Sequence, residues 1–360
     1  MSLPGYVNAT TPVSREASVF DHWLEGLTNL LLNNIPTTAL VMANGGVEEN
    51  SPMIEIPQLM GKSIKSIAGG GKSFRARLMI AKNSTVKSYD GKEAVPATEQ
   101  DPLTYAYVGV KAIMGRETIY DFEDAMIQTP EAMVNWGNIN RTQLMITYRD
   151  VIGDNLWDDG TGNSSKNFDG IRSFVHDTAE QTYAGIVATD LSTEQRAAKV
   201  WDNIRYTTAI TAFGTSNEGL KAMNNLRISI RHYSGMDPDL IVTDIRGYEG
   251  YTNTAVGTIN FNQPISATRQ SSKQLADLGI EHLLHIGTPL VEDAKCPTGK
   301  MYMLNTKTIK LLCLRKAALA FKGPVSGYTI PADTTLLKLF ANIICINRRA
   351  NGVITTINGA

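Results

Sequence analysis

The residues that could do chemistry in this chain begin with a glycine-rich run that leads into a lysine. Gly71-Lys72-Ser73 matches the end of a phosphate-binding loop. That loop needs a glycine five residues before Gly71, where Ser66 stands, and a helix after the lysine to hold the phosphate. The residues after Ser73 have a strand pattern instead. The run is therefore better interpreted as a flexible hinge than as a nucleotide site.

Metal-binding and nucleophilic side chains are scattered. His282 and His285 are spaced to share one helix face, but neither an HExxH motif nor a CxxC pair accompanies them. Asp158, Asp159 and Asp169 surround a glycine-rich segment, but their spacing does not fit a calcium loop. The GxSxG motif of a serine nucleophile is missing as well. We therefore predict no catalytic residue, no metal site and no cofactor, and expect that the chain is not an enzyme.

A basic series follows the glycine run and contains Arg75, Arg77, Lys82 and Lys87, with Tyr89 close behind. Basic and aromatic residues together can form a platform for single-stranded nucleic acid. A solvated face, or salt bridges to a neighbouring subunit, is the favoured interpretation. The 34 basic and 35 acidic residues give a net charge of −1, so no strong field attracts nucleic acid or anionic lipid.

Composition also indicates the compartment. The three cysteines are odd in number and lack paired spacing, which favours a reducing cytoplasm over a disulfide framework. The first residues show no secretory signal, and no stretch approaches the roughly 18 apolar residues of a membrane span. We therefore expect a soluble cytoplasmic product that does not bind a membrane.

The most informative element is a predicted β-hairpin from Ser73 to about Tyr120. Its arms are residues 73–80 and 103–110, and Tyr89-Asp90-Gly91-Lys92 provides a strong turn signal between them. Two strands of this length are marginally stable alone, and their open edges invite pairing with another chain. The hairpin therefore predicts a large homo-oligomer in which this arm lies across a neighbour.

Helix signals frame the rest of the chain. A short amphipathic helix is expected over residues 20–32, and Thr129-Pro130 begins a long helix that ends near Trp157. Its buried stripe would consist of Met145, Tyr148, Ile152 and Leu156. The glycine-rich residues 158–165 end it. Further helices are expected from Ser192, which forms a capping box with Gln195, through Ile204, and over residues 217–232 with a stop near Gly235. Another is expected over residues 245–255.

Strand patterns occur mainly in the last third. They are expected at residues 53–57, 238–244, 290–293, 301–305, 336–345 and 353–356. Because a long helix with one apolar face needs a covering sheet, the last two of these strands should cover the stripe of the long helix. The chain is thus predicted to have an α+β fold.

The order of these elements resembles the major capsid protein of tailed double-stranded DNA bacteriophages, whose fold is the Hong Kong 97 type. Three local passages resemble it as well: residues 159–171 after the long helix, residues 238–243 before a helix, and residues 287–306. The resemblance implies an N-terminal arm at 1–50, strand entry and an E-loop hairpin at 51–120, and a spine helix at 121–158. It further implies an axial domain at 159–285 and strands completing the peripheral domain at 286–360.

The function that this resemblance implies is a structural shell protein in the virion. Copies would assemble as pentamers and hexamers into an icosahedral capsid around packaged double-stranded DNA, which they would contact non-specifically. Partners would include a scaffolding protein, a portal and decoration proteins, and synthesis would take place in the host bacterial cytoplasm. The E-loop residues that would contact a neighbouring subunit are Arg75, Arg77, Lys87, Tyr89, Asp90, Gly91 and Lys92.

Two other functions remain open at this point. An encapsulin-like compartment uses the same fold to enclose a cargo protein, and an α/β enzyme could hide its site from sequence motifs. The segment before the hairpin is too short for a built-in scaffolding segment, so we expect a separate scaffolding protein or a mature chain.

Overall fold

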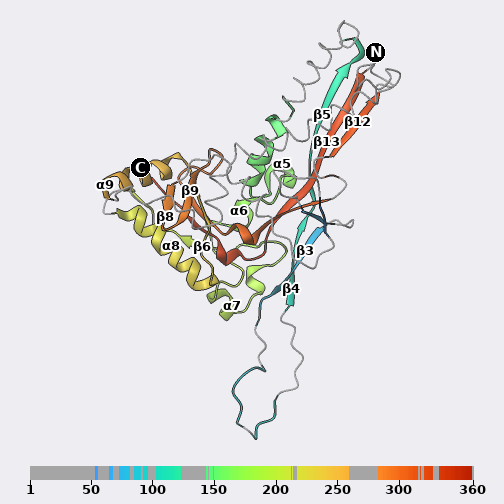
Figure 1. Cartoon of the computed structure of the whole chain (residues 1–360). Coiled ribbons are helices and arrows are strands. Elements are labelled where there is room, and N and C mark those ends of the chain that lie inside the picture. Colours follow the sequence, from blue (N-terminus) through green and yellow to red (C-terminus); the bar gives the residue numbers. More distant parts are fainter. Residues whose placement is uncertain are drawn as a thin grey trace, which may run out of the picture.

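The computed structural model of the protein describes residues 53–55, 65–67, 73–81, 85–90, 92–95, 103–122, 143–144, 146–148, 150–211, 213, 217–258, 283–314, 317, 320–326 and 332–358. The expected N-terminal helix over residues 20–32, the start of the long helix near Thr129 and His282 lie outside these residues. Figure 1 shows the described strands gathered into a lobe with helices and a long outward extension.

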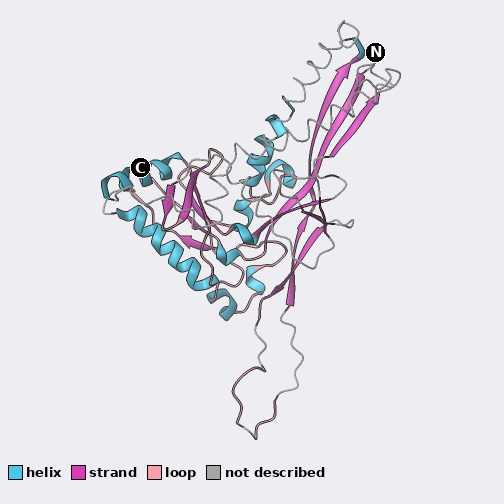
Figure 2. Cartoon of the chain, viewed as in Figure 1, coloured by secondary structure: helices cyan, strands magenta, loops and turns pink. Residues whose placement is uncertain are grey.

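The first sheet has strand order β1-β2-β11-β13-β12, and β5 also pairs with β13. Its central strand is β13, whose residues 341–345 pair with β11 and whose residues 332–341 pair with β5. Strand β12 pairs with the other edge of β13 between residues 333 and 338. Figure 2 shows β5, β12 and β13 running outward together. The strands are β1 (Met53–Glu55), β2 (Lys65–Ile67), β5 (Lys111–Tyr120), β11 (Ile309–Leu314), β12 (Ala320–Ser326) and β13 (Ala332–Cys345).

The second sheet has order β6-β14-β10-β7-β9-β8. Its central strands are buried along their whole length, as expected for apolar runs covered on both faces. Helix α8 packs against β6 and β14, and helix α9 packs against β7 and β9. The elements are β6 (Ile204–Tyr206), β7 (Leu240–Thr243), β8 (Leu283–His285), β9 (Thr288–Glu292), β10 (Met301–Leu304), β14 (Gly352–Ile354), α8 (Glu218–Ser234) and α9 (Ile245–Thr258).

The third sheet is the hairpin of β3 (Ser73–Met79) and β4 (Leu103–Gly109), paired antiparallel in continuous register. Short helical turns connect the sheets. They are α5 (Gly162–Ser165), α6 (Ile171–Phe174), α7 (Thr193–Ala197), and the 3-10 turns η1 (Ala188–Asp190), η3 (Thr306–Thr308) and η5 (Arg348–Ala350).

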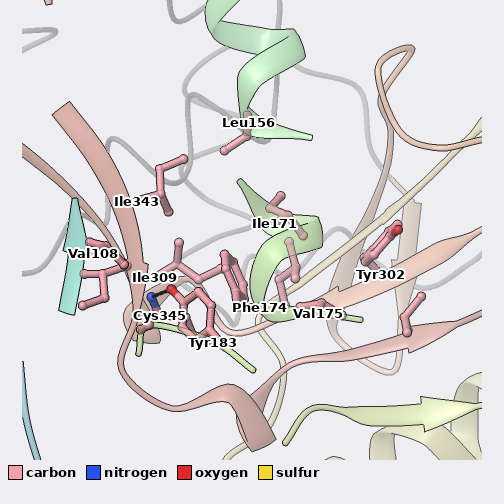
Figure 3. Close-up of a cluster of buried hydrophobic side chains, with 14 of the residues drawn as sticks. Val108, Leu156, Ile171, Phe174, Val175, Tyr183, Tyr302, Ile309, Ile343 and Cys345 are labelled. Atoms are coloured by element: carbon pink, nitrogen blue, oxygen red, sulfur yellow. Dashed lines mark hydrogen bonds between the residues drawn. The ribbon is translucent and has the colours of Figure 1, made fainter. Parts of the chain in front are cut away.

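A shared apolar core joins all three sheets. Side chains from β4, the long helix, α6, β10, β11 and β13 meet in one buried cluster, which Figure 3 shows in close-up. Labelled members include Val108 of β4, Leu156 of the long helix, Phe174 of α6 and Ile343 of β13. The hairpin is therefore rooted in the apolar core of its own chain by Phe74, Ala106 and Val108.

Several predicted elements are confirmed. The capping box of Ser192 and Gln195 opens α7, α8 ends at the left-handed Gly235, and β7 precedes α9. The long helix is present at each described position of residues 143–156. In its expected stripe Tyr148, Ile152 and Leu156 are buried, while the side chain of Met145 lies outside the described residues.

Two predictions of element boundaries are wrong. The hairpin was predicted to extend to about Tyr120, but residues 111–120 form β5 of the first sheet, because they pair with β13 over ten residues. The helix begun at Ser192 ends at Ala197, and Ile204 starts strand β6 beside β14. The strands after residue 286 divide between the two sheets, since β11, β12 and β13 belong to the first sheet and β9, β10 and β14 to the second.

Candidate functional site

The hairpin separates its side chains into two faces. On the inner face Phe74, Ala106 and Val108 are almost fully buried in the shared core, and Ala76 and Leu78 pack against it. The opposite face, which we call the outer face, consists of Arg75, Met79, Leu103, Tyr105 and Tyr107, all exposed. Met79 is 73% exposed and the two tyrosines are about half exposed. An amphipathic hairpin is thus fixed by one face and presents an apolar and aromatic surface on the other.

A short loop, residues 183–186, anchors the hairpin. The backbone N–H of Tyr107 donates to the carbonyl of Ala184 at 2.9 Å, and the side-chain amide of Gln195 donates to the Ile80 carbonyl at 3.2 Å. Gly185 has φ of +77°, and a Cβ there would lie 2.1 Å from the Tyr107 ring. Only glycine allows both this backbone conformation and this close approach. We call residues 183–186 the anchor loop.

A polar junction fixes the point where the hairpin passes into β5. The Lys111 ammonium donates to the Asp169 carboxylate at 2.8 Å and to the Gly160 carbonyl at 3.1 Å. The fully buried Asn342 of β13 donates to the Gly109 carbonyl at 2.6 Å and to the other Asp169 oxygen at 2.7 Å. Its own carbonyl accepts from the backbone of Asp169 at 2.9 Å. These contacts set the direction in which the hairpin leaves the first sheet.

The described part of the loop between β3 and β4 extends away from the body (Figure 1). The backbone N–H of Glu93 donates to the Asp90 carbonyl at 2.9 Å, so a turn forms where the sequence predicted it. Tyr89 donates its hydroxyl to the Thr85 carbonyl at 2.5 Å, and the Lys87 ammonium lies 5.2 Å from the centre of its ring. These contacts occur within a tip whose described valines, Val86 and Val95, are exposed.

The structure places most of the predicted contact residues at exposed positions. Arg75, Lys87, Asp90 and Lys92 are exposed and Tyr89 is half-buried, whereas Gly91 and the side chain of Arg77 lie outside the described residues. They do not form one cluster, because Arg75 and Arg77 belong to strand β3 while Lys87, Tyr89, Asp90 and Lys92 belong to the distant loop between β3 and β4. The apolar residues Met79, Leu103, Tyr105 and Tyr107 were not among the predicted contacts. Their alternation with Phe74, Ala106 and Val108 was the available signal.

The stripe of the long helix faces the first sheet. The Tyr148 hydroxyl donates to the Ile113 carbonyl of β5 at 2.8 Å, and Leu144 lies where a side chain on Gly115 would otherwise be. Burial and the nearby Cys313 raise the pKa of Tyr148 above its usual range. The covering strands are β5, β11 and β13, so the predicted role of residues 336–345 is supported, while β14 lies in the other sheet.

The described residues offer little catalytic chemistry. Burial raises the pKa of the Cys313 thiol to about 12 and that of Cys345 to about 11, and Cys296 shifts in the same direction, so none is a ready thiolate. Burial, followed by the charge of Arg227, lowers the pKa of His285 to about 4. No group of acidic, histidine and cysteine side chains suited to a metal ion occurs in the described part of the chain. No described helix is long and apolar enough to cross a membrane.

The fold is that of a phage capsid chain. The structure matches a chain of the capsid asymmetric unit of cyanophage A-1(L) with a TM-score of 0.62 and 17% identity, over 91% of this chain and 94% of that one. The predicted Hong Kong 97-type α+β fold is thus confirmed.

Two further similarities are weaker. The capsid of cyanophage P-SCSP1u matches with a TM-score of 0.47 and 10% identity, over 82% of this chain and 86% of that one. The SrpI encapsulin of Synechococcus elongatus PCC 7942 has a TM-score of 0.46 and 10% identity, over 79% of this chain and 82% of that one. Because both scores are low, the fold assignment depends on the first comparison. No family model and no curated protein matches the chain.

Proposed function

We propose that this chain is a major capsid protein. Copies assemble as pentamers and hexamers into an icosahedral shell that encloses packaged double-stranded DNA, and the chain is a structural protein of the virion and not an enzyme. The observation that carries this proposal is the amphipathic hairpin, because it is fixed to its own body by one face and exposes apolar and aromatic side chains on the other.

An exposed surface of this kind needs a partner. Aromatic and methionine side chains are enriched in protein interfaces, where their burial supplies most of the binding free energy. In a shell of identical subunits the partner is another copy, and the hairpin would lie over the body of its neighbour. The outer face of the hairpin, the β3 residues Arg75 and Arg77, and the tip residues Lys87, Tyr89, Asp90, Gly91 and Lys92 would form this contact.

The charge balance supports repeated contacts between copies. With a net charge of −1, subunits approach one another without strong long-range repulsion, and the chain does not hold DNA by a large positive field. Contact with the packaged DNA is therefore non-specific. A scaffolding protein, a portal and decoration proteins are the further partners of this proposal, and the host bacterial cytoplasm is the place of synthesis.

Electron microscopy of the purified full-length chain tests the proposal. We expect closed particles of uniform size in negative stain, and a matching high-mass species by light scattering. A chain that stays monomeric at every salt and protein concentration would contradict it. Particles from the natural source should release double-stranded DNA after nuclease treatment of their exterior. Particles that instead contain a cargo protein and lack DNA would identify an encapsulin-like compartment.

A further inference from the structure

A fully buried arginine lies behind the anchor loop. Arg348 of η5 donates from Nε to the Phe174 carbonyl at 2.9 Å, and from Nη1 to the carbonyls of Gln181 at 3.0 Å and Trp201 at 2.9 Å. Its guanidinium carbon lies 5.3 Å from the centre of the Tyr183 ring. One cation thus connects three points of the segment 174–201, and the anchor loop is part of that segment.

His176 lies on the same segment, two residues after Phe174. Its backbone is fixed by Asn203, which accepts from the His176 N–H at 3.1 Å and donates to the His176 carbonyl at 2.8 Å. The Nε2 atom is buried and has no hydrogen-bond partner among the described residues. A proton placed on Nε2 would lack an acceptor there, and its charge would oppose that of the buried Arg348, which binds the Phe174 carbonyl two residues before His176.

The charged groups around His176 have opposing effects. Burial, and after it the positive charge of Arg348, lowers the pKa of His176, while a hydrogen bond with the Ser173 backbone and the charges of Asp202 and Asp177 act to raise it. Both carboxylates already have cationic partners. Asp202 binds Arg205 at 2.6 Å and Lys199 at 3.4 Å, and Asp177 binds Lys300. The unfavourable effects of burial and Arg348 therefore prevail.

The same segment fixes the hairpin. The Tyr183 ring lies against Arg348, and its hydroxyl accepts the Cys345 N–H at 2.8 Å. The next residue, Ala184, supplies the carbonyl to which the Tyr107 amide of β4 is bound. A movement of Arg348 would thus reach the hairpin through two consecutive residues of the anchor loop.

We propose that His176 and Arg348 form an acid-sensitive latch on the hairpin. At mildly acidic pH, protonated His176 repels the buried guanidinium, the segment 174–201 loosens, and the anchor loop releases β4. The latch would regulate how freely the hairpin moves relative to its own body. Its relevance to shell assembly rests on the proposed capsid function.

The direction of the pH dependence follows from the lowered pKa of His176. The loosened state has a pKa nearer the ordinary 6.5 and takes up the proton more readily than the latched state. The latch is therefore fully stable above about pH 6.5 and weakens as the pH falls below that value. Asp159 and Asp202 have lowered pKa values, so their protonation comes at more acidic pH.

His285 shifts in the same direction and must be separated from His176. Its pKa of about 4 means that acid also weakens the second sheet, where it lies beside Asn224 and Tyr251. The two histidines differ in location, since His176 is connected to the anchor loop and His285 ends strand β8. Hydrogen exchange of amides in β4 therefore reports the effect of protonating His176, and exchange of amides in β10 reports that of protonating His285.

Hydrogen exchange of the unassembled full-length chain, corrected for intrinsic rates, tests the latch between about pH 7.5 and about pH 5.5. We expect the Tyr107 amide to lose protection as the pH falls through this range, by up to about tenfold. His176→Gln should remove this local pH dependence, whereas the matched His285→Gln variant should keep it.

Two outcomes would overturn the latch: an unchanged loss of protection at Tyr107 in His176→Gln, or the disappearance of that loss in His285→Gln. The second comparison does not require His176→Gln to fold and therefore remains decisive if that variant folds poorly. Because the subunit is unassembled, neither outcome depends on whether a shell forms.

Discussion

Asn342 is the residue that most directly connects the hairpin to the body. It is fully buried, and its amide reaches the Gly109 carbonyl, the Asp169 carboxylate and two backbone N–H groups, those of Asp169 and Ile343. A buried side-chain amide whose donors and acceptor are all hydrogen-bonded fixes the relative orientation of the segments that it joins as well as their separation. Asn342 therefore determines where β4 ends and β5 begins.

Replacing Asn342 with Ala should destabilise the subunit by about 2–4 kcal/mol, because several buried backbone groups lose their partner at once. Equilibrium urea unfolding measures this change. The matched control is Asn225→Ala on the exposed side of α8, which should change stability by less than about 0.5 kcal/mol. Equal effects of the two substitutions would show that the junction contributes little.

The sequence could not reveal these residues individually. Asn342 interrupts an apolar run that predicts a core strand, and nothing local indicates that its partners are Gly109 and Asp169, far away in the chain. The same holds for Arg348, because its three carbonyl acceptors come from residues 174–201. The hydrophobic periodicity of a sequence indicates only which face of a helix or strand is buried. It therefore cannot predict hydrogen bonds between side chains and residues that are distant in the chain.

At the scale of elements, the anchor loop depends on one glycine. Gly185 and Gly235 both have positive φ, but a methyl group on Gly185 would meet the Tyr107 ring, whereas a methyl group on Gly235 would face open space. Gly235→Ala should therefore cost about 1 kcal/mol for the backbone conformation alone. Gly185→Ala should cost about 1–3 kcal/mol more because the Tyr107 ring must move.

Limited proteolysis can show which part of the chain each of these two substitutions loosens. Gly185→Ala should expose β4 to limited cleavage under native conditions, because β4 loses its contact with the anchor loop. Gly235→Ala, at the end of α8, should leave the cleavage of β4 unchanged. Identical stability and cleavage in the two variants would mean that the anchor loop does not hold the hairpin.

The long helix contains one buried and one exposed isoleucine, which can be compared in the same way. Ile152 is 4% exposed and belongs to the buried stripe, whereas Ile146 of the same helix is 49% exposed. Ile152→Ala should reduce the free energy of unfolding by about 2–5 kcal/mol, and Ile146→Ala should reduce it by less than about 1 kcal/mol. Urea unfolding checks both. A stable Ile152→Ala subunit would show that the helix does not depend on the first sheet.

Elements with local signals were predicted well. The capping box at Ser192, the left-handed Gly235 and the apolar run of β7 are each encoded within a few residues. Strands β5 and β6 were missed or misplaced because distant partners, β13 and β14, determine them. Sheet pairing overrides local preference at such positions, which is the usual limit of sequence patterns.

At the scale of the whole molecule, both sheets combine distant parts of the chain. The last strands divide between them, since β13 is central to the first sheet and β14 lies inside the second. The two sheets share one apolar core with the root of the hairpin. The body is therefore a single folding unit that carries an exposed arm, and changes to the inner and outer faces of that arm should have different consequences.

The outer and inner faces of the hairpin can be tested against each other. Met79, Leu103 and Tyr105 are exposed, so replacing all three with Ser should leave the stability and the far-UV circular dichroism of the subunit unchanged. If another copy covers this face, particle yield in sedimentation should fall by about tenfold or more, since each lost apolar anchor weakens association. Phe74→Ser, on the buried face of the same strand, should instead destabilise the subunit itself by about 3–5 kcal/mol. Full assembly of the triple variant would show that the outer face is not the surface through which subunits join.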